Sequence, residues 1–395
     1  MDKVVVVGAS LAAVHAVETL REHGHVGEIE LVGAEDVLPY DRPPLSKEAL
    51  REGVDPDAVQ LHEPGWYDDL GVRLRLGQAA AHLDSRAREV VLADGARVSY
   101  DGLVIATGSR ARAVSPAAGE HESECIRSLR TLADAQALRH ELTRAKSLVV
   151  IGGGFIGLEV AATAREMGLD VAVVELAPVP LTRVLGDQVG HWFRHHHQAR
   201  GVEMHCGVAV DEIECSPGNN KVRLQDGTVL SGELVVAGVG ASPATEWLVD
   251  SGVDIGDGVH CDASLRTSVP DVVAAGDVAS WYNPLFDETM RVQQWNNALT
   301  QGRHAAATLL GHQDACAVVP YFWSDQFDAR MRFVGRSNAA SEVRIVESTD
   351  TKLVALYARD GLIRGAVCVN APRQLALYRK AIEDQVAWAD IDGSN

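Results

Sequence analysis

The six cysteines of this 395-residue chain include no close pair. They are Cys125, Cys206, Cys215, Cys261, Cys316 and Cys368, and no C-x-x-C spacing occurs among them. Disulfide frameworks and zinc sites are usually visible as short cysteine spacings, so neither is indicated and no metal is expected. We expect ordinary reduced thiols, which fits a reducing compartment.

Basic residues are also scarce. The chain has 36 Lys and Arg against 55 Asp and Glu, a formal net charge of −19. Nonspecific nucleic-acid binding needs a basic surface, so this class of protein is excluded. The charge is uneven, because residues 321–380 hold ten basic and six acidic side chains. An acidic partner would meet the least repulsion there.

Long apolar runs are missing as well. No run approaches the roughly 20 residues that span a bilayer, and the first one is too short for a signal peptide. We therefore expect no membrane association and a cytoplasmic location. The content of 46% hydrophobic and 23% charged residues is that of an ordinary globular protein. The length allows two or three domains.

Two glycine-rich turns stand out among the residues that are present. They are Gly8-Ala9-Ser10 and Gly152-Gly153-Gly154, and each follows a β-branched apolar run and precedes a helical pattern. Such a turn lets a diphosphate approach the backbone closely and meet the free N–H groups of a helix N-terminus. Two turns in this context predict two nucleotides in one chain.

The second turn is complete, with Gly152, Gly154 and Gly157. Glu175 ends the next predicted strand, where a carboxylate accepts hydrogen bonds from a ribose diol and repels a 2′-phosphate. No Lys or Arg follows at 176–178, which favours NADH over NADPH. In the first turn Ser10 and Ala13 replace two glycines, and both are small. Its acid is less clear, because Glu30 lies within a strand and Glu35 follows it.

The pattern of residues 1–106 is repeated after residue 148, which indicates duplication of a whole domain. Strands are expected at 4–7 and 29–32, a helix at 11–22, and a helix near Lys47 capped by Ser46. Residues 269–277 have no counterpart in the second repeat, so we infer that the chain returns there to the first domain. The expected fold is α/β: a Rossmann-like domain formed by 1–112 and 241–320, an inserted one at 113–240, and a smaller C-terminal α+β domain at 321–395.

Three segments carry a resemblance to a known family: Arg42–Lys47, Gly152–Glu159 and Ala275–Asp277. Together they closely resemble FAD-dependent NADH:ferredoxin reductases of the putidaredoxin reductase type, which serve Rieske dioxygenases and cytochromes P450. Apoptosis-inducing factor is similar at a greater distance. Further matches at 294–298, 301–303 and 322–328 extend the resemblance over nearly the whole chain. It implies the glutathione-reductase type of fold, with one FAD domain and one NAD(P) domain.

The resemblance also implies roles for single residues. Lys47 and Glu159 are the catalytic pair beside the flavin. Arg42 and Arg130 contact FAD phosphates, and Asp277 binds the ribityl chain. The full FAD set is Gly8, Ser10, Ala13, Glu35, Arg42, Lys47, Ala80 (through its backbone), Thr107, Gly108, Arg130, Asp277, Gln294, Trp295 and Trp323. The NADH set is Gly152, Gly154, Phe155, Ile156, Gly157, Glu159, Glu175, Arg183, Gly240 and Gln293.

Two departures from the family pattern are visible. The family usually has an acid at the position of Ala34, so Glu35 is assigned to the FAD ribose in its place. Where the family often has Glu-His before the tryptophan, this chain has Gln293-Gln294. That change removes a charge near the nicotinamide.

The route of the electrons follows from a further absence, since no cysteine precedes Cys125. Related disulfide reductases place redox cysteines on the first helix or in the segment that here reads Leu45-Ser46-Lys47. A thiol relay is therefore excluded. The remaining route leads from NADH through tightly bound, non-covalent FAD to an external acceptor, for which a [2Fe-2S] ferredoxin is the natural choice.

Basic residues in the C-terminal part are candidates for ferredoxin docking: Arg330, Arg332, Arg336 and Arg373, with Arg379 and Lys380 beside them. Two other functions stay open, an NADH oxidase or diaphorase with small acceptors and an NADH-sensing regulatory flavoprotein. The chain is expected to be a monomer or homodimer. His191, His195, His196 and His197 invite a metal-site interpretation, but a solvated helix face is the better one.

Overall fold

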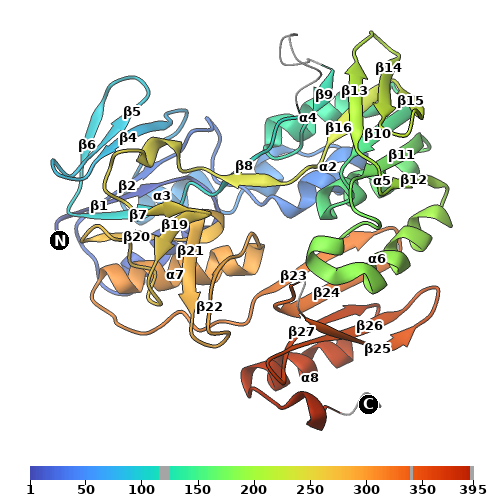
Figure 1. The fold of residues 1–395 in the computed structure, drawn as a ribbon. Coiled ribbons are helices and arrows are strands. Elements are labelled where there is room, and N and C mark those ends of the chain that lie inside the picture. The colour runs from blue at the N-terminus through green and yellow to red at the C-terminus, as the bar shows by residue number, and fades with distance from the viewer. Residues whose placement is uncertain (115–124, 339–340, 392–395) are drawn as a thin grey trace. The chain divides into compact units, whose positions relative to one another are not determined.

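A computed structural model describes residues 1–114, 125–338 and 341–391. The chain divides into two compact units (Figure 1). Unit 1 comprises Met1–Asp41, Asp55–Arg110 and Ser242–Pro320, and unit 2 comprises Arg42–Val54, Ala111–Ala241 and Tyr321–Asn395. The short strands β8 (Ser109–Ala111) and β17 (Ala241–Pro243) lie where the chain passes from one unit to the other. No helix among the described residues is both long and apolar enough to cross a bilayer.

A five-stranded parallel sheet forms the centre of unit 1. Its strands, in spatial order, are β20 (Val272–Ala274), β7 (Gly102–Ile105), β1 (Lys3–Val7), β2 (Glu28–Val32) and β3 (Val72–Arg75). The β-branched run of β1 is buried on both faces, as a central parallel strand requires. Chain order reverses between β7 and β2, on the two sides of β1, and such a switch point is where open α/β sheets bind ligands.

Helices cover one face of this sheet and a second sheet covers the other. Helix α1 (Leu11–Glu22) packs on α7 (Trp295–Leu309). The antiparallel sheet of β4 (Ala80–Asp84), β5 (Glu89–Leu92) and β6 (Arg97–Ser99) contributes Leu83 and Val90 to a core shared with Val5 and Leu103. The remaining elements of the unit are η2 (Pro56–Val59), α3 (Pro64–Asp69), η3 (Glu246–Leu248), β18 (Ile255–Gly256), β19 (Gly258–Cys261), η4 (Gly276–Val278), β21 (Ala279–Asn283) and β22 (Glu288–Arg291).

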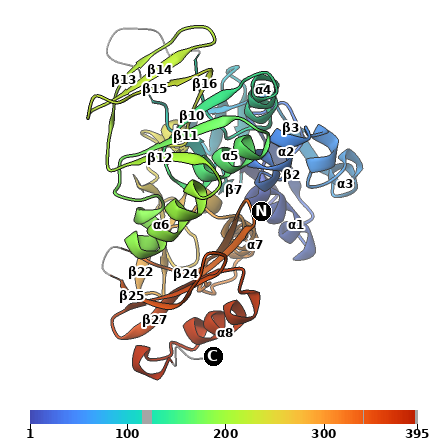
Figure 2. The same cartoon turned by 90° about the vertical axis from the view of Figure 1, so that its right-hand side faces the viewer.

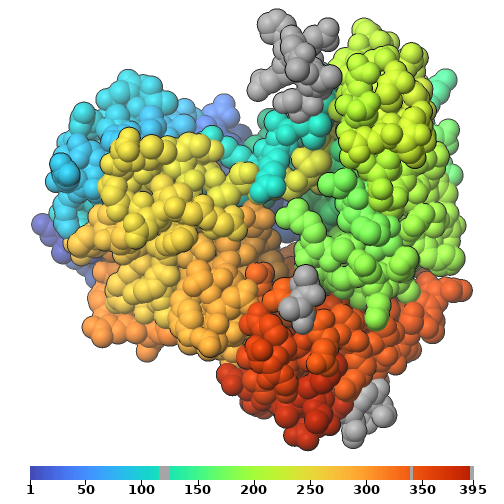
Figure 3. Space-filling view, viewed as in Figure 1, coloured from blue at the N-terminus to red at the C-terminus, as the bar shows by residue number. Residues whose placement is uncertain are grey.

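Unit 2 repeats this arrangement. Its parallel sheet runs in the order β12 (Val202–Cys206), β11 (Asp170–Glu175), β10 (Ser147–Ile151), β16 (Leu234–Ala237) and β9 (Ile126–Arg127). The hairpin sheet of β13 (Val210–Glu214), β14 (Asn220–Leu224) and β15 (Val229–Gly232) packs on it and is visible at the surface of the unit in Figure 3. The helices are α4 (Leu132–Leu142), α5 (Phe155–Glu166) and α6 (Thr182–Gln198).

Two other stretches of the chain join unit 2. Residues 42–54 form η1 (Pro43–Ser46) and α2 (Glu48–Arg51), which pack on α4 and α5. The C-terminal part is an antiparallel sheet in the order β23 (Tyr321–Gln326), β24 (Ala329–Gly335), β27 (Leu362–Val369), β26 (Leu353–Arg359) and β25 (Glu342–Ser348). Helix α8 (Pro372–Glu383) covers one face, α6 lies against the other, and η5 (Trp388–Asp390) follows (Figure 2).

The expectations for the cysteine pairing and for Ser46 are wrong. Cys125 and Cys215 form a disulfide that joins the residue before β9 to the residue after β13, with their Cα atoms 5.8 Å apart. Their 90-residue separation hid the pair, whereas the other four cysteines are free thiols as expected. Ser46 does not cap a helix, because it ends η1 and its hydroxyl instead donates to the carboxylate of Glu159.

Candidate functional site

The predicted FAD residues of unit 1 gather at one edge of its parallel sheet. Gly8 follows β1, Glu35 follows β2, Thr107 follows β7, and Asp277 follows β20. The carboxyl ends of parallel strands share an edge, so the topology brings these four stretches together around the switch point. Gly276 lies against both helices there, because a Cβ on it would be 3.2 Å from that of Ala12 and 3.6 Å from that of Ala298.

The first glycine turn fits a diphosphate. Gly8 has φ +111°, and a Cβ there would lie 2.1 Å from the carbonyl oxygen of Ala106, so no side chain fits. Ser10 is the N-cap residue of α1, yet its hydroxyl makes no cap hydrogen bond. The first-turn N–H groups of α1 therefore lack a side-chain cap, as they do in helices that bind phosphate. Ala13, in the place of a third glycine, is fully buried.

The N-cap and the first two turns of α7 offer polar groups in the same unit. The side-chain amide oxygen of Gln301 accepts from the N–H of Gly276 at 2.9 Å, and its NH₂ group is buried without a hydrogen-bond partner among the described residues. The side-chain amide oxygens of Gln294 and Asn297 are also buried without a hydrogen-bond partner among the described residues. Orphaned buried polar groups are rare and suit a polar ligand. Trp295, at the first position of the helix, donates to Asp41 at 2.6 Å.

The acids near the first turn have separate roles. Glu30 is buried in β2 and pairs with Lys3 at 2.7 Å and with Arg75. Burial opposes its ionisation, but these two cations lower its pKa, so Glu30 stabilises the fold. Glu35 is half-buried and accepts a hydrogen bond from the Tyr40 hydroxyl at 2.7 Å. The carboxylate of Glu35 is therefore oriented, and its role toward a ribose stays a prediction.

The remaining predicted FAD residues have varied surroundings. Ala80 begins β4, and Thr107 donates to the carbonyl of Ala244 at 2.8 Å. Gly108 accepts from the N–H of Ala244, and Asp277 accepts from Ser109 at 3.0 Å. Four more belong to unit 2: Arg42, Lys47, Arg130 and Trp323. Among these, the guanidinium of Arg42 donates to the carbonyl oxygen of Arg130.

The second turn is tighter than the first. A Cβ on Gly157 would lie 2.1 Å from the carbonyl oxygen of Gly152, and one on Gly152 would lie 2.4 Å from that of Gly238. Gly154 is the N-cap of α5 and has no side chain to satisfy the first-turn N–H groups. This turn therefore also fits a diphosphate.

The acid of the second turn is held firmly. Glu175 ends β11 and accepts from the backbone N–H of Gly153 at 2.6 Å and of Ala177 at 2.7 Å. Its carboxylate is thereby fixed beside the glycine turn, in the position that a ribose diol would meet. Leu176 next to it is exposed and uncharged, so no basic side chain follows Glu175 directly.

The other predicted NADH residues are more dispersed. Phe155 packs edge-on against Phe322 with ring centroids 4.8 Å apart, while Ile156 is partly exposed. Gly240 has φ +97°, and its carbonyl accepts from Arg112. Arg183 is exposed on α6, and Gln293 is exposed in unit 1.

The predicted pair of Lys47 and Glu159 is present. The Lys47 ammonium lies 2.8 Å from Glu159 Oε2, and the side chains are 14% and 4% exposed. Glu159 is on α5, two residues after Gly157, and also accepts from the hydroxyls of Ser46 at 2.5 Å and Ser324 at 2.6 Å. A buried carboxylate requires such partners. Sequence reasoning missed both serines, although each lies inside a segment that carries the family resemblance.

The histidine cluster divides in two. His191 and His195 are exposed on α6 as expected, but the expectation of a solvated face is wrong for His196 and His197, which are buried. Val189, Phe193, His196 and His197 are all buried and follow helical spacing, a signal that the sequence did contain. Burial lowers the pKa of His197 to about 4. No group of three or more metal-ligating side chains occurs in the described ranges.

The predicted docking arginines differ in availability. Arg330 and Arg332 both pair with Asp325, at 3.8 Å and 2.8 Å, and their side chains are 60% and 28% exposed. Arg336 is half-buried, and Arg373 is exposed on α8. The pairs Arg379–Glu383 and Lys380–Asp384 lie along α8. Arg330 and Arg373 thus present the most accessible positive charge of the four.

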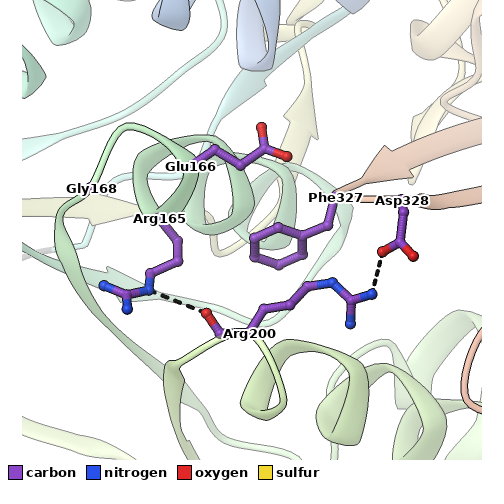
Figure 4. A pocket seen from close by; sticks show the side chains of 6 residues that line it. All are labelled: Arg165, Glu166, Gly168, Arg200, Phe327 and Asp328. Atoms are coloured by element: carbon purple, nitrogen blue, oxygen red, sulfur yellow. Dashed lines mark hydrogen bonds and ion pairs between the residues drawn. The ribbon is translucent and has the colours of Figure 1, made fainter.

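A pocket of about 690 Å³ lies at the far end of α5 from the glycine turn (Figure 4). Figure 4 shows the Phe327 ring between the side chains of Arg165, Glu166 and Arg200, with Gly168 and Asp328 at the edges. Arg200 pairs with Asp328 and lies over Phe327, 5.5 Å from the ring centre. Two basic and two acidic groups line the pocket, so it is not selective for an anionic nucleotide.

Comparison with known proteins places this site in a family. Residues 2–302 match the model of the pyridine nucleotide-disulphide oxidoreductases, and residues 321–391 match a reductase C-terminal domain. The ferredoxin–NAD(+) reductase component of the anthranilate 1,2-dioxygenase system from Burkholderia cepacia is 36% identical, covering 96% of this chain and 94% of that one.

Solved structures agree. The ferredoxin reductase for the CYP199A2 system of Rhodopseudomonas palustris superimposes with a TM-score of 0.91 at 35% identity, covering 98% of both chains. The covalent putidaredoxin reductase–putidaredoxin complex matches with a TM-score of 0.92 at 33% identity, covering 98% of this chain and 94% of that one.

The fold and the two nucleotide turns define a pyridine nucleotide-disulphide oxidoreductase, and within that class the chain belongs to the family of ferredoxin–NAD(+) reductases. The expected fold class and the resemblance noted in the sequence are confirmed. Despite the name of the class, the segment of Lys47 carries Ser46 and no cysteine.

Proposed function

We propose that this protein is an FAD-dependent NADH:ferredoxin reductase that supplies an oxygenase of the Rieske or cytochrome P450 type. One NADH gives up a hydride, two [2Fe-2S] ferredoxins each take one electron, and one proton is released. The proposal is carried by one combination of features. Both glycine turns fit a diphosphate, and the chain has no cysteine before Cys125. The first helix and the segment of Lys47, where related disulfide reductases carry their redox cysteines, therefore offer no thiol to accept the electrons.

FAD would be held at the edge of the unit 1 sheet by the Gly8 turn, Asp277 and the start of α7. When bound, FAD accepts a hydride and releases its electrons singly. NADH would bind at the Gly152 turn, where Glu175 selects the unphosphorylated ribose. Glu159 lies on the helix that this turn opens and is ion-paired with Lys47, which supports a role for the pair at the nicotinamide end of NADH.

Ferredoxin docking is assigned to the basic surface of the C-terminal domain. Support comes from the ferredoxin partner in one similar solved structure, the putidaredoxin complex, and from the ten basic and six acidic residues at 321–380. Arg330→Glu should raise the ferredoxin KM more than Arg332→Glu, because Arg330 is more exposed and farther from Asp325. Both variants should retain NADH–ferricyanide turnover. Equal ferredoxin KM values in both variants and the native protein would contradict this assignment.

The test of the function uses the purified holoprotein under anaerobic conditions. NADH should bleach the flavin absorbance, NADPH should do so poorly, and an oxidised [2Fe-2S] ferredoxin should restore it faster than dissolved oxygen does. Faster reoxidation by oxygen would indicate an NADH oxidase instead. Slow turnover with a long-lived flavin–NAD charge-transfer band would indicate a redox-sensing regulator.

A further inference from the structure

A buried chain of hydrogen bonds runs from α6 through the C-terminal sheet to Glu159. His197 Nε2 lies 2.9 Å from the Gln326 amide oxygen, and Gln326 Nε2 lies 3.0 Å from the Ser324 hydroxyl. That hydroxyl lies 2.6 Å from Glu159 Oε1. Ser324, Gln326 and His197 are all fully buried, and Ser324 and Gln326 lie two residues apart on one face of β23.

Each hydrogen bond in this series is donated in the direction of the Glu159 carboxylate. An ionised carboxylate only accepts, so Ser324 must donate to Glu159, and the lone pairs of its hydroxyl then receive the Gln326 NH₂ group. The amide oxygen of Gln326 consequently faces His197, which must carry its proton on Nε2. Burial lowers the pKa of His197 to about 4, which keeps the imidazole neutral and fixed in this donor role.

The two oxygens of Glu159 are thereby given different partners. Oε2 accepts hydrogen bonds from Lys47 and Ser46, whereas Oε1 accepts one only from Ser324 among the described residues. Without Ser324, Oε1 would be buried and unsatisfied, and the carboxylate could rotate away from Lys47. The hydrogen bond from β23 therefore fixes the plane of the carboxylate.

We propose that Ser324 and Gln326 of the C-terminal domain are positioning residues that orient Glu159 and thereby hold the Lys47 ammonium in place for reaction with NADH. This inference rests on the proposed function. It gives the C-terminal domain a part in the NADH half-reaction, in addition to ferredoxin docking. Phe327, the residue after Gln326, packs edge-on against His197 and also lines the pocket of Figure 4.

The experiment measures anaerobic flavin reduction by NADH in the holoprotein. Ser324→Ala should slow the limiting rate about tenfold, the effect of one hydrogen bond to a charged group, and change the NADH dissociation constant less than about threefold. Gln326→Leu should give a smaller loss of the same kind, and Ser324→Thr, which keeps the hydroxyl, should recover most of the rate. Ser348→Ala, on an exposed serine of the same sheet, is the matched control.

A double-mutant cycle separates positioning from general damage to the fold. In a Lys47→Met background, Ser324→Ala should change the rate less than about twofold, because there is no ammonium left to position. The same tenfold loss in both backgrounds, or no loss in either, would overturn the proposal.

A second readout does not depend on turnover. The thermal midpoints of the purified variants should show the same coupling between Ser324 and Lys47, and additive midpoints would also overturn the proposal. A native protein that fails to react with NADH would refute the proposed function, while the cycle in thermal midpoints would still decide the role of Ser324.

Discussion

The two glycine turns of this protein have the same topology but differ in the residues around them. Each follows the central strand of a five-stranded parallel sheet, and in each unit a three-stranded sheet packs behind it. In unit 1 a small side chain, Ala13, occupies the third position, and Glu35 is oriented by the Tyr40 hydroxyl. In unit 2 only glycine fits at 157, and Glu175 is held by two backbone N–H groups. The two units thus share a scaffold and differ in the residues at the glycine turn and in the way the nearby acid is held.

The largest difference that can be removed is the disulfide in unit 2. Cys125→Ser together with Cys215→Ser should lower the free energy of unfolding by about 4 kcal/mol, because the bridge closes a long loop in the unfolded chain. Urea denaturation measures this loss, and dithiothreitol should give the native protein the midpoint of the variant. Cys206→Ser, on a free thiol of the same unit, is the control. A midpoint that is insensitive to dithiothreitol would show that the two thiols are not joined.

Exchange of the third turn residue should affect the two units unequally. Gly157→Ala should cost about 3 kcal/mol and abolish NAD⁺ binding, because its Cβ would overlap the Gly152 carbonyl. Ala13→Gly should cost only about 1 kcal/mol, as glycine does within a helix. Denaturation and NAD⁺ titration measure both effects. Similar losses in the two variants would mean that the turns are equivalent.

The buried imidazole of α6 should make the stability of unit 2 depend on pH. Burial lowers the pKa of His197 to about 4, whereas in the unfolded chain it is near 6.5. The unfolded state therefore binds a proton that the folded state excludes, and stability falls as the pH drops from 6.5 toward 4, by about 3 kcal/mol in total. His197→Gln should remove this part of the slope, and exposed His195→Gln should not. Identical pH profiles of all three proteins would contradict the assignment.

The smallest effect is expected from substitution of the acid beside each glycine turn, Glu175 or Glu35. Glu175→Gln should raise the KM for NADH about tenfold and reduce the preference for NADH over NADPH, because a charge-assisted hydrogen bond to the ribose is lost. Glu35→Gln should leave both values unchanged. Steady-state ferricyanide reduction with the two cofactors measures this. An equal response to both substitutions would assign Glu35 to the same nucleotide.

Much of this molecule could be predicted from the sequence because its signals are local. The β-branched runs, the glycine turns and Glu175 all lie within one β–turn–α–β stretch, where spacing alone determines geometry. The Lys47–Glu159 pair is different, since its residues are far apart and only family resemblance joined them. Contacts that depend on tertiary packing were not predicted from the sequence. They are the disulfide, the burial of His196 and His197, and the hydrogen bond from the Ser46 hydroxyl to Glu159.

The carboxylate of Glu159 also limits how this protein can be recombined with its relatives. Its three donors come from residues 46–47 and 324, on stretches that enter unit 2 from either end of the chain. A chimera that exchanges only residues 113–240 would inherit the acid from one parent and its partners from the other. The stretch 113–240 is therefore contiguous in sequence, but it does not contain the residues that donate to Glu159. Crossovers should preserve 42–54, the insert and the C-terminal sheet as one inherited block.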